Sequence, residues 1–355
     1  MQRLPAAGTT PARIAAFALA IALLLLPGLP APDSRAQDGA GAHALQKTDQ
    51  RNASVAATVS KSVVAVVPIG TALGDWYSVA GGAGFVIDTN GHVLTALINV
   101  GSSSRVNVVI PGGKMVRAEV VGRDERNGCA LLKVDREAAS VPPLTFANSE
   151  SLSIGATTYT FGNPFSSVVN DDQIAFSSGT LSGRYRPTVK ESGDERESRV
   201  GLYAGPVLET TCAINDGNFG GPLTDRHGHV IGLVVKLISY QRWLGCAVPI
   251  NQIAFALPRL KAGQAPLAND PGLSSETVPG EPGAKLNAIV EGGAAAKAGL
   301  AVGDVVLKVD SETVADNAAL SRILEALPAG ARLNLQVKSG DQTRFVAITL
   351  AAKRE

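Results

Sequence analysis

The stretch that decides the fold reads Asn215-Asp216-Gly217-Asn218-Phe219-Gly220-Gly221-Pro222-Leu223. Glycines stand on both sides of one aromatic residue, Phe219. Because glycine adopts backbone conformations that other residues avoid, a crowd of glycines lets several backbone N–H groups turn toward a common point. Convergent N–H groups of this kind form an oxyanion hole. The stretch therefore predicts an oxyanion-hole-like backbone at Gly217, Asn218 and Phe219.

Short β-rich runs separated by turns surround this stretch. Examples are Val63–Pro68, His92–Leu97, Ala130–Val134 and Val230–Val235. Many short strands at near-regular spacing, with few helical stretches, are typical of an all-β barrel or sandwich. We therefore expect an all-β domain over residues 54–262, closed by a short helix at Asn251–Leu260.

This β-rich unit resembles the trypsin-like proteases, and specifically the HtrA/DegP family of extracytoplasmic proteases with PDZ domains. The segments that match the family in order are Gly82–Ile87, Gly91–Thr95, Gly122–Asp124, Gly162–Phe165, Gly228–Gly232 and Cys246–Pro249. The resemblance covers roughly residues 54–350. It implies an all-β trypsin-like double β-barrel, the chymotrypsin fold, followed by a small α+β PDZ domain.

The three positions that carry the catalytic triad of this family hold other residues here. Family members read Gly-Asn-Ser-Gly-Gly-Pro-Leu around the nucleophile, and this chain has Phe219 in place of the serine. By the same resemblance, Ile98 occupies the position of the histidine and Gly128 that of the aspartate. These side chains offer no nucleophile, no base and no group that orients a base. The resemblance therefore implies a pseudoprotease with no catalytic residues and no enzyme activity.

Neighbouring residues do not replace the lost groups. Asn99, Cys129 and Asn218 each lie one place from a lost residue, and a one-residue slip in a strand turns a side chain to the opposite face. Three aliphatic residues follow Cys129, as is typical of an inert core thiol. The chain has four histidines, and none is placed to serve as a base at Phe219.

No metal or cofactor is expected, although His227 and His229 flank a glycine close to Asp225. Two histidines at i and i+2 without a further ligand framework are more typical of a surface turn.

In the resembled fold, Cys212 and Cys246 belong to segments that line the primary substrate pocket. In an exported protein they form either a disulfide or two free core thiols, and both alternatives stay open.

Residues 1–36 are predicted to be a signal peptide. Arg3 and Arg13 precede the apolar run Ile14–Leu26, and small residues follow it. The run is shorter than the ~20 residues that span a bilayer, and its flanks are typical of secretory signals. We therefore expect a periplasmic or secreted protein. An uncleaved anchor is the alternative, and it would be the chain's only link to a membrane.

The composition excludes several other classes of protein. Hydrophobic residues make up 45% of the 355 residues and charged residues 18%, which excludes a disordered chain, a collagen and a coiled coil. The formal net charge is +1, and residues 1–36 contribute three arginines and one aspartate, so +1 − 2 leaves −1 without them. This balance favours a polypeptide partner over nucleic acid.

The C-terminal part of the chain, residues 284–352, is predicted to be a PDZ domain. Its run Ala294–Val306 is close to the pattern Ser-Pro-Ala-Ala-x-Ala-Gly-Leu-x-x-Gly-Asp-x-Ile of bacterial PDZ domains. Residues 263–283 lack periodicity and are expected to be a linker, with residue 271 as an alternative start of the first PDZ strand. Residues 37–53 are expected to be a flexible lead-in.

The resemblance to PDZ domains implies that this part binds a polypeptide or a protein C-terminus as an added strand and holds the carboxylate on backbone N–H groups. The expected peptide-binding residues are Gly272, Leu273, Ser274, Leu320 and Ile323. The alternative is a purely structural PDZ domain whose helix contributes only core residues.

Taken together, these features predict an exported HtrA-like protein that binds polypeptides or protein partners without cleaving them, as a scaffold, holdase or regulator. One alternative is an active serine-type endopeptidase of protein quality control that uses an unrecognised site. Another is a structural subunit that modulates an active HtrA paralogue. A homo-oligomer is left open, because residues 37–60 lack the aromatic contacts that would identify a trimer interface.

Overall fold

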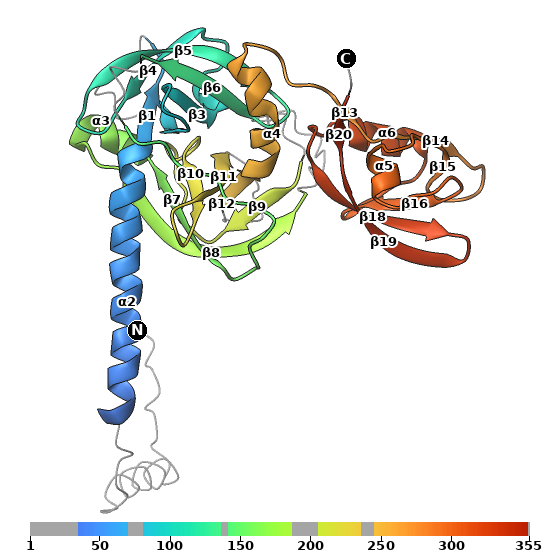
Figure 1. Ribbon diagram of the computed structural model, residues 1–355, viewed down its shortest axis with the longest axis horizontal. Helices are drawn as coiled ribbons and strands as arrows, with labels where there is room; N and C mark the ends of the chain where they lie inside the picture. Colours follow the sequence, from blue (N-terminus) through green and yellow to red (C-terminus); the bar gives the residue numbers. More distant parts are fainter. Residues whose placement is uncertain (1–34, 70–80, 136–140, 187–204, 236–244, 354–355) are drawn as a thin grey trace, which may run out of the picture. The chain divides into compact units, whose positions relative to one another are not determined.

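A computed structural model describes residues 35–69, 81–135, 141–186, 205–235 and 245–353 (Figure 1). The signal peptide predicted for residues 1–36 therefore lies almost entirely outside the described residues. None of the helices within these ranges is both long and apolar enough to cross a membrane. By its internal contacts the chain divides into two units, Met1–Arg51 and Asn52–Glu355.

Helix α2 (Arg35–Val59) occupies the region where a flexible lead-in was predicted, so that prediction is wrong. The side chains of residues 43–50 are mostly exposed, which is why no apolar periodicity marks the helix. Its sequence is nevertheless rich in alanine and in other good helix formers. The intrinsic helix propensity of these residues accounts for the helix, although the sequence has no apolar periodicity that would have predicted it.

Six antiparallel strands form a first closed barrel in the order β1-β2-β3-β6-β5-β4 (Figure 1). Their bounds are β1 (Val63–Val67), β2 (Gly82–Val86), β3 (His92–Ala96), β4 (Arg105–Val109), β5 (Met115–Asp124) and β6 (Cys129–Val134). The 3-10 helices η2 (Ser60–Ser62) and η3 (Leu97–Asn99) precede β1 and follow β3. The barrel is filled mainly by β-branched valines, which suit the crowded interior of a sheet.

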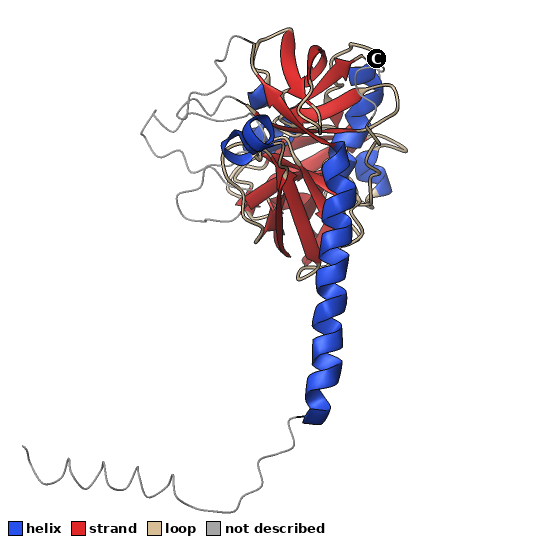
Figure 2. Ribbon diagram, turned by 90° about the vertical axis from the view of Figure 1, so that its left-hand side faces the viewer, coloured by secondary structure: helices blue, strands red, loops and turns tan. Residues whose placement is uncertain are grey.

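A second closed barrel has the order β10-β11-β12-β9-β8-β7. Its strands are β7 (Thr157–Gly162), β8 (Ala175–Tyr185), β9 (Val207–Thr210), β10 (Pro222–Asp225), β11 (Val230–Val235) and β12 (Gly245–Pro249). The short helices η4 (Pro164–Ser166) and α3 (Ser167–Asp171) lie between β7 and β8, and α4 (Ile250–Lys261) follows β12. Figure 2 shows the strands of the barrels in red. Two six-stranded barrels confirm the predicted double β-barrel.

One apolar cluster joins the two barrels. Phe85 and Leu94 come from the first barrel, Phe161 from the second and Ile253 from α4. Val55 and Val59, in the last two turns of α2, are buried in the same cluster. The shared core holds the barrels against each other, and the segments at their junction carry the candidate site.

The PDZ domain is a sheet in the order β14-β15-β16-β18-β19, with β17 paired to β16 and a separate pair β13-β20. The bounds are β13 (Asn269–Asp270), β14 (Leu273–Thr277), β15 (Ala284–Ile289), α5 (Ala294–Lys297), β16 (Val305–Val309), β17 (Glu312–Thr313), α6 (Asn317–Glu325), β18 (Arg332–Ser339), β19 (Gln342–Thr349) and β20 (Ala351–Ala352). Strands β13 and β14 lie inside the predicted linker 263–283, so the linker is shorter than expected, and β14 agrees with the alternative start of the first PDZ strand at residue 271. These strands are short and polar, and β13 forms through pairing with the C-terminal β20.

A buried arginine links the PDZ domain to the second barrel. Arg186, directly after β8, pairs with Asp310 at 3.5 Å and with Glu312 at 2.6 Å. Burial raises the pKa of Asp310, and Arg186 opposes that rise. The two domains of the Asn52–Glu355 unit therefore share a desolvated ion-pair cluster.

Candidate active-site region and peptide groove

The fold brings together Ile98, Gly128 and Phe219, the positions that align with the catalytic residues of the resembled family. Ile98 lies in η3, directly after β3, and Ala96 pairs with Cys129 in the β3–β6 ladder. The N–H of Leu97 donates to the carbonyl of Gly128 at 2.8 Å, which joins the first two positions. Asn99 reaches the third, because its Nδ2 donates to the carbonyl of Phe219 at 2.7 Å.

Asn99 is the centre of a buried polar network. Only 8% of the residue is exposed, and its Nδ2 lies 2.9 Å from Thr95 Oγ1 and 3.2 Å from the carbonyl of Ala83. Thr95 Oγ1 in turn donates to the Ala83 carbonyl at 2.7 Å, and the N–H of Ala83 donates to the Phe219 carbonyl at 2.9 Å. The Asn99 amide is thus bound to backbone and hydroxyl oxygens, a structural role and not that of a base.

The side chains at positions 98 and 128 provide no acid–base group. Ile98 is an exposed apolar residue, with 49% of its surface accessible. Gly128 is buried and has φ +63, a left-handed conformation that favours glycine over most residues. A hydrocarbon and a hydrogen therefore stand where the resembled family has an imidazole and a carboxylate.

Phe219 is partly buried and packs against the apolar cluster of the second barrel, which includes Leu208 and Ala247. Ile214 belongs to the same contact group and lies so close to Gly245 that a Cβ there would collide with it. Apolar side chains from the segment around the glycine cluster therefore pack directly onto β12.

The glycines of the cluster are required by close backbone approach. Gly217 has φ +99 and a Cβ there would collide with the carbonyl of Asn163, while Gly220 has φ +89 and abuts the carbonyl of Ala83. The N–H of Asn218 donates to the Asn215 carbonyl at 3.0 Å. Turn closure thus uses the Asn218 N–H, which argues against Asn218 as an oxyanion-hole donor, and the roles expected for Gly217 and Phe219 stay predictions.

All three cysteines are buried and none forms a disulfide, so the Cys212–Cys246 disulfide considered from the sequence is not formed. The Cys212 sulfur lies 3.4 Å from the carbonyl of Thr158, whereas that of Cys246 lies 4.0 Å from the hydroxyl of Tyr185. The two thiols therefore have different neighbours. Burial, with a smaller effect from Asp124, raises the pKa of the Cys129 thiol. A thiol that stays protonated is a poor nucleophile.

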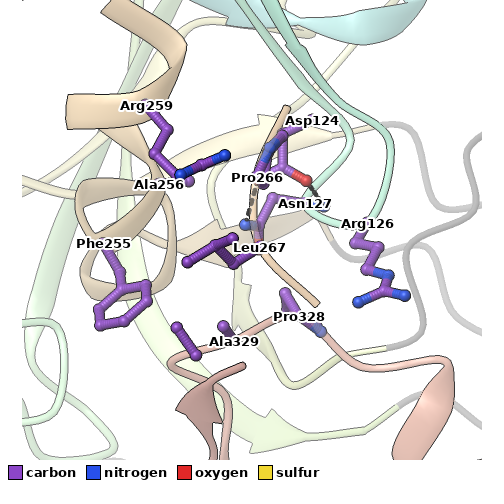
Figure 3. Close-up of a pocket in the computed structure, with 11 residues that line it drawn as sticks. Asp124, Arg126, Asn127, Phe255, Ala256, Arg259, Pro266, Leu267, Pro328 and Ala329 are labelled. Atoms are coloured by element: carbon purple, nitrogen blue, oxygen red, sulfur yellow. Dashed lines mark hydrogen bonds between the residues drawn. The ribbon is translucent and has the colours of Figure 1, made fainter. Parts of the chain in front are cut away.

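Asp124 is the buried carboxylate nearest in sequence to Gly128, and it is already engaged. It accepts hydrogen bonds from the N–H of Asn127 at 3.1 Å and from its Nδ2 at 2.7 Å, which hold the turn before Gly128. The same turn borders a pocket of about 220 Å³ into which Phe255 and Leu267 also project (Figure 3). Asp124 therefore shapes a turn and contacts no histidine among the residues described.

His43 is exposed in α2, whereas His92, His227 and His229 contact aspartates at turns. His92 Nδ1 lies 2.8 Å from Asp88 Oδ2. Asp225 Oδ1 accepts the backbone N–H groups of His227 at 2.8 Å and of His229 at 3.0 Å. Within the described ranges no three His, Cys, Asp or Glu side chains gather in a way that could hold a metal ion.

A groove of about 440 Å³ lies between β14 and α6 of the PDZ domain. Three of the five predicted peptide-binding residues, Leu273, Ser274 and Leu320, line it. Ile323 is not among the lining residues and belongs to the domain core, so its role in binding stays a prediction. Gly272 lies outside the lining residues, in the loop before β14.

Sequence reasoning missed the polar residues of this groove. Ser275 Oγ donates to Asn317 Oδ1 at 2.6 Å, and the Asn317 N–H donates to Thr277 Oγ1 at 3.1 Å. Near the other end, Asn269 Nδ2 donates to the carbonyls of Leu324 and Leu327. These bonds hold β14 and α6 at a set distance, and no local motif predicts them because the partners are at least 40 residues apart in the sequence.

Comparison with known proteins agrees with this geometry. Residues 82–233 match the trypsin-like peptidase domain family, and residues 271–350 match the PDZ domain family. In this order of domains the chain is similar to HtrA-type proteases. A probable periplasmic serine endoprotease DegP-like of Halomonas elongata is 30% identical to this HtrA-like chain over 282 residues. The match covers 76% of the chain and 56% of that relative, so the chain spans little more than half of the relative's length.

Two further matches cover most of the chain. The putative serine protease HhoA of Synechocystis is 28% identical over 291 residues, which cover 77% of the HtrA-like chain and 71% of HhoA. The solved structure "HtrA-type protease AlgW with decapeptide" superposes with a TM-score of 0.54 over 86% of this chain and 99% of that chain. At 19% sequence identity this superposition shows the fold.

Proposed function

We propose that this HtrA-like protein binds polypeptides without cleaving them. The observation that carries the proposal is the convergence of Ile98, Gly128 and Phe219, joined by the bonds Leu97–Gly128 and Asn99–Phe219. Each of these positions holds a side chain without acid–base or nucleophilic chemistry. The scaffold of a protease is therefore retained around a site that lacks the groups for acyl transfer.

The size of the expected loss follows from how a triad works. Nucleophile, base and orienting carboxylate act as a unit, and removal of the unit costs on the order of 10⁶ in turnover. Binding and an oxyanion hole alone can leave roughly 10³–10⁴ over the uncatalysed rate. Here even that residual rate enhancement is reduced, because Phe219 and Ile214 pack onto the second barrel where a substrate side chain would enter.

The binding part of the proposal rests on the PDZ groove. Strand β14 ends its sheet and has α6 beside it, so an extended segment can add to the free edge while its side chains enter the groove. The relatives named above are periplasmic or putative serine proteases, which supports a location outside the cytoplasm. Unfolded or extended polypeptides in that compartment are the partners that this geometry suits.

The test of the first half uses a serine-reactive fluorophosphonate probe and fluorescent casein, with an active DegP-like relative as the positive control. We expect neither labelling nor cleavage by the chain expressed from residue 37. Cleavage that persists after repurification and disappears with a single substitution in this chain would show that it is an active endopeptidase with another site.

The test of the second half measures binding of unfolded casein by fluorescence anisotropy. Saturable binding supports the proposal, and its absence contradicts it. A change in the activity of a DegP-like protease on mixing, without binding of casein by the HtrA-like chain itself, would identify a regulatory subunit instead.

A further inference from the structure

The loop Asp270-Pro271-Gly272 leads into the PDZ groove, and its backbone N–H groups determine whether the groove can bind a terminal carboxylate. In a PDZ domain that binds C-termini, consecutive backbone N–H groups of this loop receive the terminal carboxylate. The inference drawn from the loop rests on the proposed polypeptide-binding function and specifies which part of a polypeptide the groove selects.

Two of the three N–H groups at positions 271, 272 and 273 cannot serve a carboxylate. Pro271 has no N–H. The N–H of Gly272 donates to Oδ1 of Asp270 at 2.8 Å. Among these positions, Leu273 alone keeps an N–H that is not removed or capped by the loop itself.

The Asp270 cap is held in place by the surrounding structure. Asp270 pairs with Ala351 in the β13–β20 ladder. The carbonyl of Pro271 accepts the N–H of Ala295 at 3.0 Å, and that of Gly272 accepts the N–H of Val290 at 2.9 Å. A ligand carboxylate would therefore have to displace a protein carboxylate from a loop that is fixed on both sides.

The charged side chains around the groove do not replace the lost N–H groups as a binding site for a carboxylate. Arg126 and Lys353 line the groove together with Glu325, and Asp270 adds a second negative charge beside Gly272. Two positive and two negative side chains leave no net attraction for an anion. The side-chain charges around the groove therefore do not favour a terminal carboxylate over an uncharged segment of the chain.

We propose that the groove between β14 and α6 selects an internal, extended polypeptide segment and has no preference for a free C-terminal carboxylate. The segment adds to the edge of β14 through main-chain hydrogen bonds, with side chains against Leu273 and Leu320. Such a groove can engage an unfolded chain anywhere along its length, which suits a binder that does not cut.

The test uses overlapping ten-residue casein peptides, each synthesised as a free acid and as a C-terminal amide, and the full chain from residue 37. Every peptide that binds is expected to bind in both forms with affinities within about threefold. A free acid that binds about tenfold tighter, which corresponds to about 1.4 kcal/mol, would overturn the inference and leave the proposed function intact. Failure of all peptides and of whole casein would contradict the proposed function itself.

A loop variant gives the matched experiment. Asp270→Ala combined with Pro271→Leu supplies two N–H groups, so free acids are expected to gain about tenfold in affinity while amides are unchanged. Asp316→Ala is the control, because Asp316 Oδ1 caps α6 through the N–H of Ala319 and not the loop. It should lower stability without changing the ratio of acid to amide binding. An unchanged ratio in the folded loop variant would show that the loop does not decide selectivity.

Discussion

The side-chain amide of Asn99 donates a hydrogen bond to the carbonyl of Phe219 at 2.7 Å. It joins the segment that follows β3 to the glycine cluster before β10, two stretches 120 residues apart. In the resembled family pattern Asn-Asn-His-Val-Val, position 99 corresponds to a valine. The chain thus has a buried polar link directly beside the position that lacks a histidine.

Removal of this link is expected to destabilise the protein. Asn99→Ala leaves the Phe219 carbonyl without one of its donors and should lower the free energy of unfolding by about 1–3 kcal/mol. Asn99→Asp should cost more at pH 7, because a carboxylate oxygen would replace the donor that faces the carbonyls of Ala83 and Phe219. Urea unfolding measures both. An Asn99→Ala variant within about 0.5 kcal/mol of the parent, the range of neutral surface changes, would contradict the structural role of Asn99.

The arrangement of positions 98, 128 and 219 predicts how activity could be built. Phe219→Ser alone should show no labelling by a fluorophosphonate, because its hydroxyl would have no base. The triple variant Ile98→His, Gly128→Asp and Phe219→Ser should become labelled, with the aspartate contributing roughly 10⁴ in rate over the double variant that lacks it. Equal labelling of the single and triple variants would show that these positions do not form one site.

Acid should weaken the contact between the β2–β3 turn and α4. Burial raises the pKa of Asp88, but hydrogen bonds from Lys261 at 2.6 Å and from His92 at 2.8 Å outweigh it, and the pKa falls from 3.8 to about 2. A folded-state pKa below the unfolded value means that the stabilisation is complete above about pH 4 and is lost as the pH falls to 2.

Asp88→Asn tests this pH dependence. The difference in unfolding free energy between the parent and this variant should be constant from pH 7 to pH 5 and should shrink steadily below pH 4. Lys261→Met should remove part of the same difference. A gap that stays constant down to pH 2.5 would contradict the assignment of the pKa to these contacts.

The number of thiols that react with Ellman's reagent should rise on unfolding and should not depend on a reductant. Without any reductant, the guanidinium-unfolded protein should present three reactive thiols per chain, since none of Cys129, Cys212 and Cys246 forms a disulfide. In the folded protein Cys129 should stay unreacted toward Ellman's reagent, because it is buried and its thiol is kept protonated. A count of one thiol in the unfolded chain would show that Cys212 and Cys246 had formed a disulfide.

The fold was predictable because local patterns carried it. Apolar runs predicted most of the barrel strands but not β9 or β10, and the resemblance to family motifs, Ala294–Val306 among them, predicted the double barrel and the PDZ domain. The same motifs aligned Ile98, Gly128 and Phe219 with the catalytic positions, because spacing along a strand is preserved when side chains change. Helix α2 and strand β13 were missed, since one has no apolar stripe and the other exists only through pairing with the end of the chain.

Which residues a chain carries, and hence which chemistry it lacks, can be read from the order of its amino acids. What those residues contact depends on groups that meet only after folding. The Asn99 amide finds its acceptor 120 residues away, and strand β13, which carries Asp270, forms by pairing with β20 near the end of the chain. Motifs therefore predicted the protease-like scaffold and aligned Ile98, Gly128 and Phe219 with its catalytic positions, whereas long-range hydrogen bonding determined how the segments around these positions are held together.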